Sequence, residues 1–345
     1  MNQSNPSSGR INVLSIDGGG IRGIIPAALL NAIENCVGRP LSEVFDLISG
    51  TSTGGIIALA IGTKAKGNGP YSPSEVLDIY RQHGAEIFQS HWYSAIKAYV
   101  HGPKYSADGL EAVLEQCFGE VQFSSALTPL LISSYDLASQ APYFFKSHRI
   151  AADSSWDWPI KVIARATSAA PTYFPPLRLM DGPKERALVD GGVFVNNPAM
   201  AAYAEARMLY PTAAEYFVLA VGTGNRDDKI TYERAQGWGL VGWAKQIVPV
   251  MMDSVSEAVD YELDAMIGAA PCTNHHRLQP EITFASPDMD NVTPQNLGDL
   301  QKQAAQFLTA NANEIQQICN ELKKGRGSRM PGIGPQPSGA GAGRG

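Results

Sequence analysis

A serine flanked by two glycines is the residue of this sequence best suited to act as a nucleophile. Ser52 lies at the centre of the pentapeptide GTSTG, between Gly50 and Gly54. The apolar residues 44–49 predict a buried strand before it, and residues 56–61 predict a helix after it. At such a junction the glycines leave room for a sharp turn, and the helix N-terminus favours negative charge beside the serine. Taken alone, the pattern also fits a glycine-rich turn with a capping serine.

An aspartate that follows another predicted strand could serve as the base. Residues 188–190 form a short apolar segment that delivers Asp190 to a turn made by Gly191 and Gly192. Partial burial raises the proton affinity of a carboxylate, so Asp190 could take the proton of Ser52 directly. An ordinary Asp-Gly turn is the alternative for this aspartate taken alone.

Histidine is the usual base for a serine nucleophile, and none of the six histidines has a persuasive setting. They are His83, His91, His101, His148, His275 and His276. In the order nucleophile, acid, histidine, only His275 or His276 could follow Asp190, and we place both in a polar stretch outside the core. A triad therefore stays possible without support, and a serine–aspartate dyad is the alternative.

A glycine-rich loop near the N-terminus could bind an anion. The loop of residues 17–23 follows one predicted strand and precedes a predicted helix, and Gly18, Gly20 and Gly23 satisfy G-x-G-x-x-G. A nucleotide-binding module is therefore a rival interpretation, although the acidic residue expected at the end of the next strand is missing. The same backbone amides could bind the oxyanion of a tetrahedral intermediate, with Arg22 adding charge or bracing the loop.

The remaining pattern alternates strands with helices, which predicts an α/β protein. Further strands are expected at residues 11–16, 130–135, 143–145 and 216–221, and further helices at residues 24–37, after the caps Ser72 and Ser106, and at residues 297–322. We expect a flexible N-terminus over residues 1–10, a single domain over residues 11–322, and a disordered tail over residues 323–345. Within the domain, the core spans residues 11–225 and a helical C-terminal part spans residues 226–322.

The composition limits which binding partners and which cellular compartment we expect. The 345 residues are 44% hydrophobic, which supports a large core, and a net charge of −6 argues against nucleic acid as a partner. The first ten residues lack an apolar run and no segment could span a bilayer, so we expect a cytoplasmic protein. The four cysteines are too far apart for a short-spaced metal motif, and we expect free thiols and no metal.

Four short segments together resemble the signatures of patatin-like phospholipases. They are the glycine loop, the serine pentapeptide, the proline-rich residues 169–176 and the aspartate turn of residues 190–192, in the order of that family. The resemblance implies a three-layer α/β/α sandwich with a mostly parallel central sheet and additional C-terminal helices. It also assigns roles: Ser52 as nucleophile, Asp190 as general base, Gly18, Gly19, Gly20 and Arg22 at the oxyanion hole, and Gly50, Gly54, Gly191 and Gly192 as support for the turns.

The activity implied is that of a phospholipase A type lipid acyl hydrolase, without a required cofactor. Its substrate would be a phospholipid membrane surface, with transient membrane association. The sequence is similar to the cyclic-dinucleotide-activated phospholipases of antiphage defence, which implies an activator such as cyclic GMP–AMP. An entrance covered by residues 91–101 or 238–252 would restrain the enzyme.

Several alternatives stay open. An acyltransferase or a thioesterase would use the same dyad, because both form an acyl-enzyme and differ only in the acceptor. A nucleotide-binding module would use the loop from Gly18 to Gly23. A catalytically inactive lipid-binding protein would hydrolyse no ester and would not use Ser52 as a nucleophile. A homo-oligomer also stays open.

Overall fold

The computed structural model describes residues 9–88, 102–226, 230–269 and 273–324. These residues form an eight-stranded sheet in the order β5-β6-β3-β2-β1-β7-β9, with β4 paired to β3. The strands are β1 (Arg10–Ile16), β2 (Leu47–Thr51), β3 (Leu130–Asp136), β4 (Ala141–Lys146), β5 (Leu177–Asp181), β6 (Lys184–Asp190), β7 (Glu215–Val221) and β9 (Thr273–Leu278). A separate two-stranded ladder joins β8 (Asn225–Arg226) to β10 (Glu281–Ile282).

The centre of the sheet is parallel, as the family resemblance implied. Strand β1 pairs in parallel with β2 and β7, β2 pairs in parallel with β3, and β7 pairs in parallel with β9. Strands β4, β5 and β6 join in antiparallel orientation. Parallel neighbours end at the same edge, so the loop after β1 and the turn after β2 lie side by side.

Side chains alternate between two cores along the central strands. Leu14 and Ile16 of β1 belong to one core cluster, whereas Val13, the residue before Leu14, belongs to the other. Because neighbouring residues of a strand point to opposite faces, both faces of the sheet are covered by helices. The three-layer α/β/α sandwich is confirmed.

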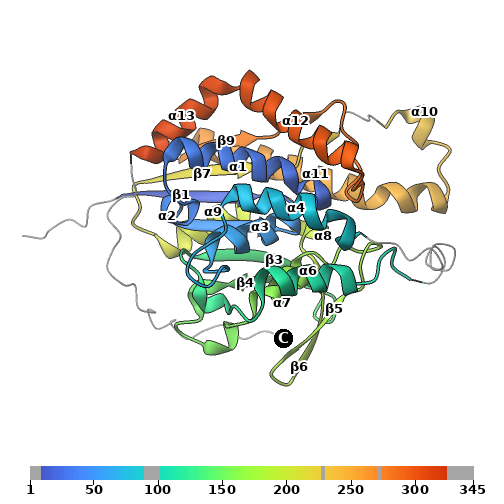
Figure 1. The fold of residues 1–345 in the computed structure, drawn as a ribbon, viewed down its shortest axis with the longest axis horizontal. Coiled ribbons are helices and arrows are strands. Elements are labelled where there is room, and N and C mark those ends of the chain that lie inside the picture. Colours follow the sequence, from blue (N-terminus) through green and yellow to red (C-terminus); the bar gives the residue numbers. More distant parts are fainter. Residues whose placement is uncertain (1–8, 89–101, 227–229, 270–272, 325–345) are drawn as a thin grey trace, which may run out of the picture.

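Helices cover the two faces in unequal numbers (Figure 1). One face carries α1 (Ile24–Val37), α3 (Thr53–Gly62), α4 (Pro73–Ile87), α6 (Asp108–Phe118) and α7 (Ile160–Thr167), with α12 (Pro294–Ala310) and α13 (Ala312–Lys323) packed on α1. The other face carries α9 (Ala199–Leu209) and α11 (Leu240–Ala269), and the short helices are α2 (Leu41–Val44), α8 (Gly192–Val195) and α10 (Tyr232–Ala235). Among the described helices, none has the length and apolar character needed to cross a bilayer.

Several predicted elements have different bounds in the structure. The strand expected at residues 44–49 begins only at Leu47, because α2 ends at Val44 and Asp46 is held beside β1 by two hydrogen bonds with Asn12. The single helix expected at residues 297–322 is divided at Asn311, whose side-chain amide donates to the Phe307 carbonyl and ends α12.

The two predicted caps had different outcomes. Ser72 forms a capping box with Glu75 at the start of α4, as expected. Ser106 does not cap a helix, because α6 begins at Asp108 after Ala107 and the Ser106 hydroxyl donates to the Asp108 carboxylate. A polar residue near a helix start is therefore only sometimes its cap.

The C-terminal part contributes more than helices. It supplies β9, which extends the central sheet beside β7 and contains His275 and His276. The prediction of a polar stretch outside the core was wrong, because an edge strand can be polar and still pair with the sheet. The flexible N-terminus and the tail expected over residues 323–345 lie largely outside the described residues, although Arg10 begins β1 and Lys323 ends α13.

Two of the cysteines are not free. Cys36 of α1 and Cys319 of α13 form a disulfide, with 6.1 Å between their Cα atoms and a separation of 283 positions in the sequence. The prediction of four free thiols was therefore wrong for this pair. Packing of α13 on α1 brings them together, and the sequence offered no local sign of it. Cys117 is free, and Cys272 lies outside the described residues.

Candidate functional site

The turn between β2 and α3 holds Ser52 in a strained conformation. Its φ of 55° and ψ of −126° are uncommon for a residue other than glycine, and such strain is frequent at functional sites. The Ser52 amide donates to Thr167 Oγ1 at 2.9 Å, which fixes the turn. A Cβ atom at Gly50 would overlap the Gly54 backbone, and one at Gly54 would overlap the Ile16 carbonyl. Both glycines of the pentapeptide are therefore required by close backbone approach.

Sheet register brings Asp190 to the level of this turn. Thr51 at the end of β2 pairs with Ser133, and the next residue of β3, Ser134, pairs with Asp190. Strand β6 is antiparallel to β3, so Asp190 reaches this level from the opposite direction to Ser52. Ser52, the residue after β2, and Asp190, the last residue of β6, are thus brought to the same end of the sheet.

The Asp190 carboxyl is buried and has no ion-pair partner among the described residues. Its Oδ1 accepts a hydrogen bond from the Gly192 amide at 2.7 Å, whereas Oδ2 makes none of good geometry. Burial raises the pKa of Asp190 to about 7, against the opposing effects of the nearby Ser52 hydroxyl and the Gly192 amide. The carboxyl can therefore exchange a proton near neutral pH.

The glycine loop offers two free amides beside the serine. The Gly18 amide donates to the Asn196 carbonyl at 3.1 Å, and the Ile21 amide donates to the Met289 carbonyl at 2.8 Å. The Gly19 and Gly20 amides donate to no residue within the described ranges. Of the three glycines predicted at an oxyanion hole, two therefore have an N–H available, and Gly18 supports the loop instead.

Arg22 braces the loop. Its side chain is buried, and Nη1 donates to the Gly224 carbonyl at 3.1 Å. Burial lowers its pKa, while the charge of Asp253 opposes this effect. Arg22 does not line the cavity beside Ser52, so its observed contacts are those of a brace.

An ion-pair network that sequence reasoning missed holds the start of the loop. Both terminal nitrogens of Arg277 on β9 contact the Asp17 carboxylate, at 3.1 and 2.6 Å, and Arg277 Nε lies 2.9 Å from Asp260 Oδ2 on α11. Asn197 in turn donates to the other oxygen of Asp260 at 2.8 Å. Burial raises the pKa of Asp17 to about 6, and the charge of Arg277 acts against it. Asp17 and Arg277 are 260 positions apart in the sequence, so no local pattern reveals the pair.

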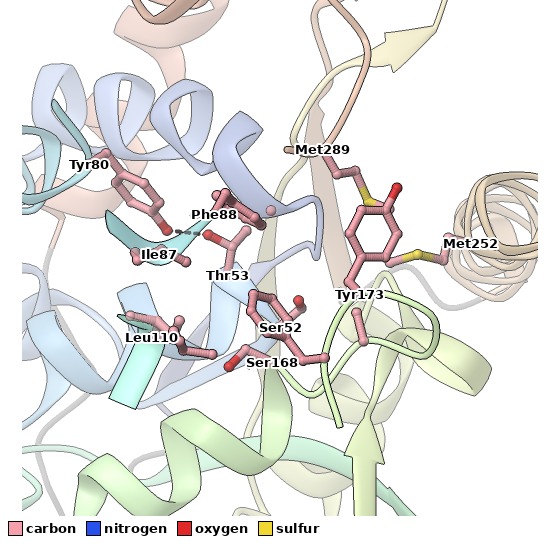
Figure 2. A pocket seen from close by; sticks show the side chains of 14 residues that line it. Ser52, Thr53, Tyr80, Ile87, Phe88, Leu110, Ser168, Tyr173, Met252 and Met289 are labelled. Atoms are coloured by element: carbon pink, nitrogen blue, oxygen red, sulfur yellow. Dashed lines mark hydrogen bonds between the residues drawn. The ribbon is translucent and has the colours of Figure 1, made fainter. Parts of the chain in front are cut away.

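An apolar cavity of about 60 Å³ opens beside Ser52 (Figure 2). Figure 2 shows Met252 of α11 and Met289 on either side of Tyr173, and a hydrogen bond between Thr53 and Tyr80. The cavity is lined by Gly20, Ser52, Thr53, Ile56, Tyr80, Ile87, Phe88, Leu110, Ser168, Ala170, Tyr173, Phe174, Met252 and Met289. Carbon and sulfur atoms dominate these walls, so the cavity suits a hydrocarbon group.

The described histidines lie in other surroundings. None of them lines the cavity, and each contacts a carboxylate outside it: His83 contacts Glu86, His148 contacts Glu205, His275 contacts Asp264 and His276 contacts Glu314. His91 and His101 lie outside the described residues. Within the described part of the chain, Asp190 is thus the candidate base, because the Ser52 hydroxyl lies close enough to act on its pKa.

Known proteins resemble this chain in sequence and in fold. The sequence model of the patatin-like phospholipase family matches residues 14–203. Patatin-like protein 2 of Arabidopsis thaliana is 32% identical over 90% of this chain and 86% of its own, and Patatin-T5 of Solanum tuberosum is 32% identical over 83% and 81%. Among solved structures, human GIVD cytosolic phospholipase A2 aligns with a TM-score of 0.46 at 13% identity, over 92% of this chain and 60% of its own.

The Arg277 network generates a prediction about stability. We expect Arg277→Ala to lower the free energy of unfolding by about 3–5 kcal/mol at pH 8, because it leaves Asp17 buried and unpaired. The folded-state pKa of Asp17, about 6, exceeds its ordinary value of 3.8, so the protonated carboxyl favours the folded state. The free energy of unfolding therefore falls as the pH rises from about 4 to above 6 and Asp17 loses its proton. Removing Arg277 raises the pKa further, so the loss should be smaller at pH 5. Urea unfolding at both pH values measures it.

The matched control is Arg178→Ala, which removes an exposed ion pair with Glu185. It should change the free energy of unfolding by less than about 1 kcal/mol. Equal effects of the two substitutions, or an Arg277→Ala loss that does not depend on pH, would contradict the role given to the network.

Proposed function

Because this chain belongs to the patatin-like phospholipase family, whose members are lipid acyl hydrolases, we propose that it is a phospholipase A type enzyme with Ser52 and Asp190 as its dyad. The observation that carries the proposal is the register that sets a strained Ser52 beside a buried Asp190 with a pKa of about 7. A general base with a pKa near the working pH is the most effective.

The proposed reaction begins when Asp190 accepts the Ser52 proton as Oγ attacks the carbonyl carbon of a fatty acyl ester. The Gly19 and Gly20 amides stabilise the oxyanion of the tetrahedral intermediate. Asp190 then gives its proton to the departing alcohol oxygen, which leaves an acyl group on Ser52. Water attacks this ester with Asp190 again as base, releasing a fatty acid and restoring the serine.

The apolar cavity supports a lipid substrate. Its walls place hydrocarbon-compatible side chains such as Ile56, Phe88 and Leu110 around the serine turn. An acyl chain of a membrane phospholipid is the group we assign to it. An acyltransferase or a thioesterase would use the same steps with another acceptor or leaving group, and mass spectrometry of the products from mixed phospholipid vesicles separates these reactions.

The nucleotide-binding alternative has less support. Of the amides in the glycine loop, those of Gly18 and Ile21 already donate to backbone carbonyls. Two adjacent free amides fit a single oxyanion better than the two phosphates of a dinucleotide. The loop is therefore assigned to catalysis.

Control by a cyclic dinucleotide such as cyclic GMP–AMP is the second part of the proposal. Its support is the similarity of the motifs to the activated phospholipases of antiphage defence. A second cavity, of about 150 Å³, lies against α11 and offers Arg226 and Gln246 as donors to an anionic ligand, although Asp253 also lines it. Because α11 also carries Met252 into the cavity beside Ser52, a ligand at this place could favour an open entrance through differential affinity.

The proposed dyad generates a prediction about activity. Ser52→Ala should abolish ester hydrolysis, and Asp190→Asn should lower kcat at least about 10²-fold, because an amide cannot accept the serine proton. The control is Asp181→Asn on the neighbouring strand β5, which should retain activity. Circular dichroism and unfolding midpoints verify folding. A folded, active Ser52→Ala protein would refute the mechanism.

The pH profile tests the same assignment in a different way. Asp190 must be ionised to act as a base, and its pKa is about 7. We therefore expect kcat/KM on a soluble ester to rise about tenfold per unit up to pH 7 and then level off. A profile with its midpoint near pH 4, the ordinary value for an aspartate, would show that the burial of Asp190 does not govern the rate.

Activation is tested by assaying vesicle hydrolysis across a series of cyclic dinucleotides and by measuring their binding calorimetrically. Binding should raise the rate, and Arg226→Ala should weaken both effects, whereas Arg149→Ala, beside Trp156 on another part of the surface, should leave them unchanged. Full activity without a ligand, together with no binding of any cyclic dinucleotide, would remove this part of the proposal and leave the hydrolase intact.

A further inference from the structure

Helix α11 has one face that supports the site. Met252 lines the cavity beside Ser52, and Val259 and Leu263 belong to the core cluster under α9. Between them, Ser256 accepts a hydrogen bond from the Asn196 side chain at 3.1 Å. This face is therefore fixed to the sheet side of the molecule.

The opposite face of its N-terminal half carries an apolar stripe in solvent. Trp243, Ile247 and Met251 are 43%, 40% and 44% exposed. They recur every four residues, so they lie on one side of the helix. Three large apolar side chains aligned in this way differ from the scattered exposed hydrophobic residues of ordinary surfaces.

Two further features suit this stripe to contact with a surface: an aromatic pair at its start and its position on a projecting part of the molecule. Trp238, just before the helix, contacts Trp243 edge to face with 5.2 Å between the ring centroids. Figure 1 shows α10 and the N-terminal end of α11 projecting from one side of the molecule. Tryptophan is enriched where proteins meet the boundary between membrane and water. A projecting apolar stripe with such a pair can reach a flat surface before the rest of the protein does.

The distribution of charge along α11 limits which part of the helix can contact a bilayer. The sequence from residue 238 to residue 252 contains one charged residue, Lys245. The following residues 253–264 contain five acidic residues and no basic one. A bilayer can accept the first segment, whereas the acidic second segment has to stay in water.

The stripe also continues into the site. Met251 is the last residue of the exposed face, and its neighbour Met252 lines the cavity that contains Ser52. A lipid that leaves a bilayer along the stripe therefore arrives at the mouth of this cavity. Resting on the function proposed above, we propose that the stripe of Trp238, Trp243, Ile247 and Met251 is the surface with which this protein docks on a zwitterionic phospholipid bilayer.

The test compares a triple variant with a matched one. Trp243→Ser, Ile247→Ser and Met251→Ser together remove the three residues of the stripe that lie on α11, leave Trp238 in place, and change no residue of the catalytic cavity. Met180→Ser, Met208→Ser and Tyr261→Ser together form the control, because these side chains are at least as exposed and lie elsewhere on the surface. Binding to phosphatidylcholine vesicles is measured by sedimentation. Quenching of tryptophan fluorescence by brominated lipids reports contact with the acyl region.

We expect the triple variant to bind vesicles at least tenfold more weakly and to lose vesicle hydrolysis in proportion, with its hydrolysis of a soluble short-chain ester within twofold of wild type. The control should match wild type throughout. In the wild type, brominated lipids should quench tryptophan fluorescence, and the triple variant should lose most of that quenching.

Three results would overturn the docking surface. One is unchanged vesicle binding by the triple variant, and another is an equal loss of soluble-ester and vesicle hydrolysis. The third is a wild-type dimer that the substitutions separate without altering vesicle binding, because a second copy of the chain would then cover the stripe. If the wild type hydrolyses neither substrate, the proposed function fails, and the binding measurement still decides the docking surface.

Discussion

The burial of the Asp190 carboxyl without a cation is the constraint on which this structure depends. A carboxylate in such a place is costly to ionise, and the energy has to come from the packing around it. The strands on both sides supply that packing, since Val189 and Leu188 are buried and Ser134 fixes the register. Had an arginine lain beside Asp190, its pKa would fall and the group would lose its use as a base. The site therefore requires a rigid sheet that keeps this carboxyl away from both water and positive charge.

Asp17, by contrast, is a buried carboxyl with a partner. Arg277 holds it with two contacts, and Arg277 also contacts Asp260 on α11. The two aspartates lie at the ends of two strands of one sheet, Asp17 just after β1 and Asp190 at the end of β6. Asp190 can exchange a proton, whereas Asp17 fixes the glycine loop in place. The difference comes from β9, because its Arg277 contacts Asp17, whereas no cation of the described residues contacts Asp190. An edge strand from the C-terminal part thus completes a site whose motifs all lie in the first 200 residues.

Local features of the fold could be read from the sequence, and distant ones could not. The helix predicted at residues 24–37 matches α1, and the turn around Ser52 follows from glycines whose neighbours leave no room for a side chain. Strand β9 escaped prediction because its residues are polar and pair only at one edge. The disulfide and the Arg277 network join residues more than 250 positions apart, and such pairs follow from packing rather than pattern. The amide of Gly18 donates a hydrogen bond within the protein, whereas those of Gly19 and Gly20 donate to no residue that the structure describes. Only the positions of these amides in the structure reveal that difference.

Helix α11 links the catalytic site to the exposed apolar surface, because its two halves have different roles. The half after residue 252 is fixed to the loops of the site by Ser256 and Asp260, whereas the half before it carries exposed apolar side chains. Pro249 lies within the first half, two residues before Met251, and removes one backbone hydrogen bond from the helix. Bending at this place costs less energy than at any regular turn of the same helix, since the missing bond need not be broken. The part of α11 before Pro249, which carries Trp243 and Ile247, can therefore change its angle to suit a surface while the part after Pro249 keeps the catalytic loops in position.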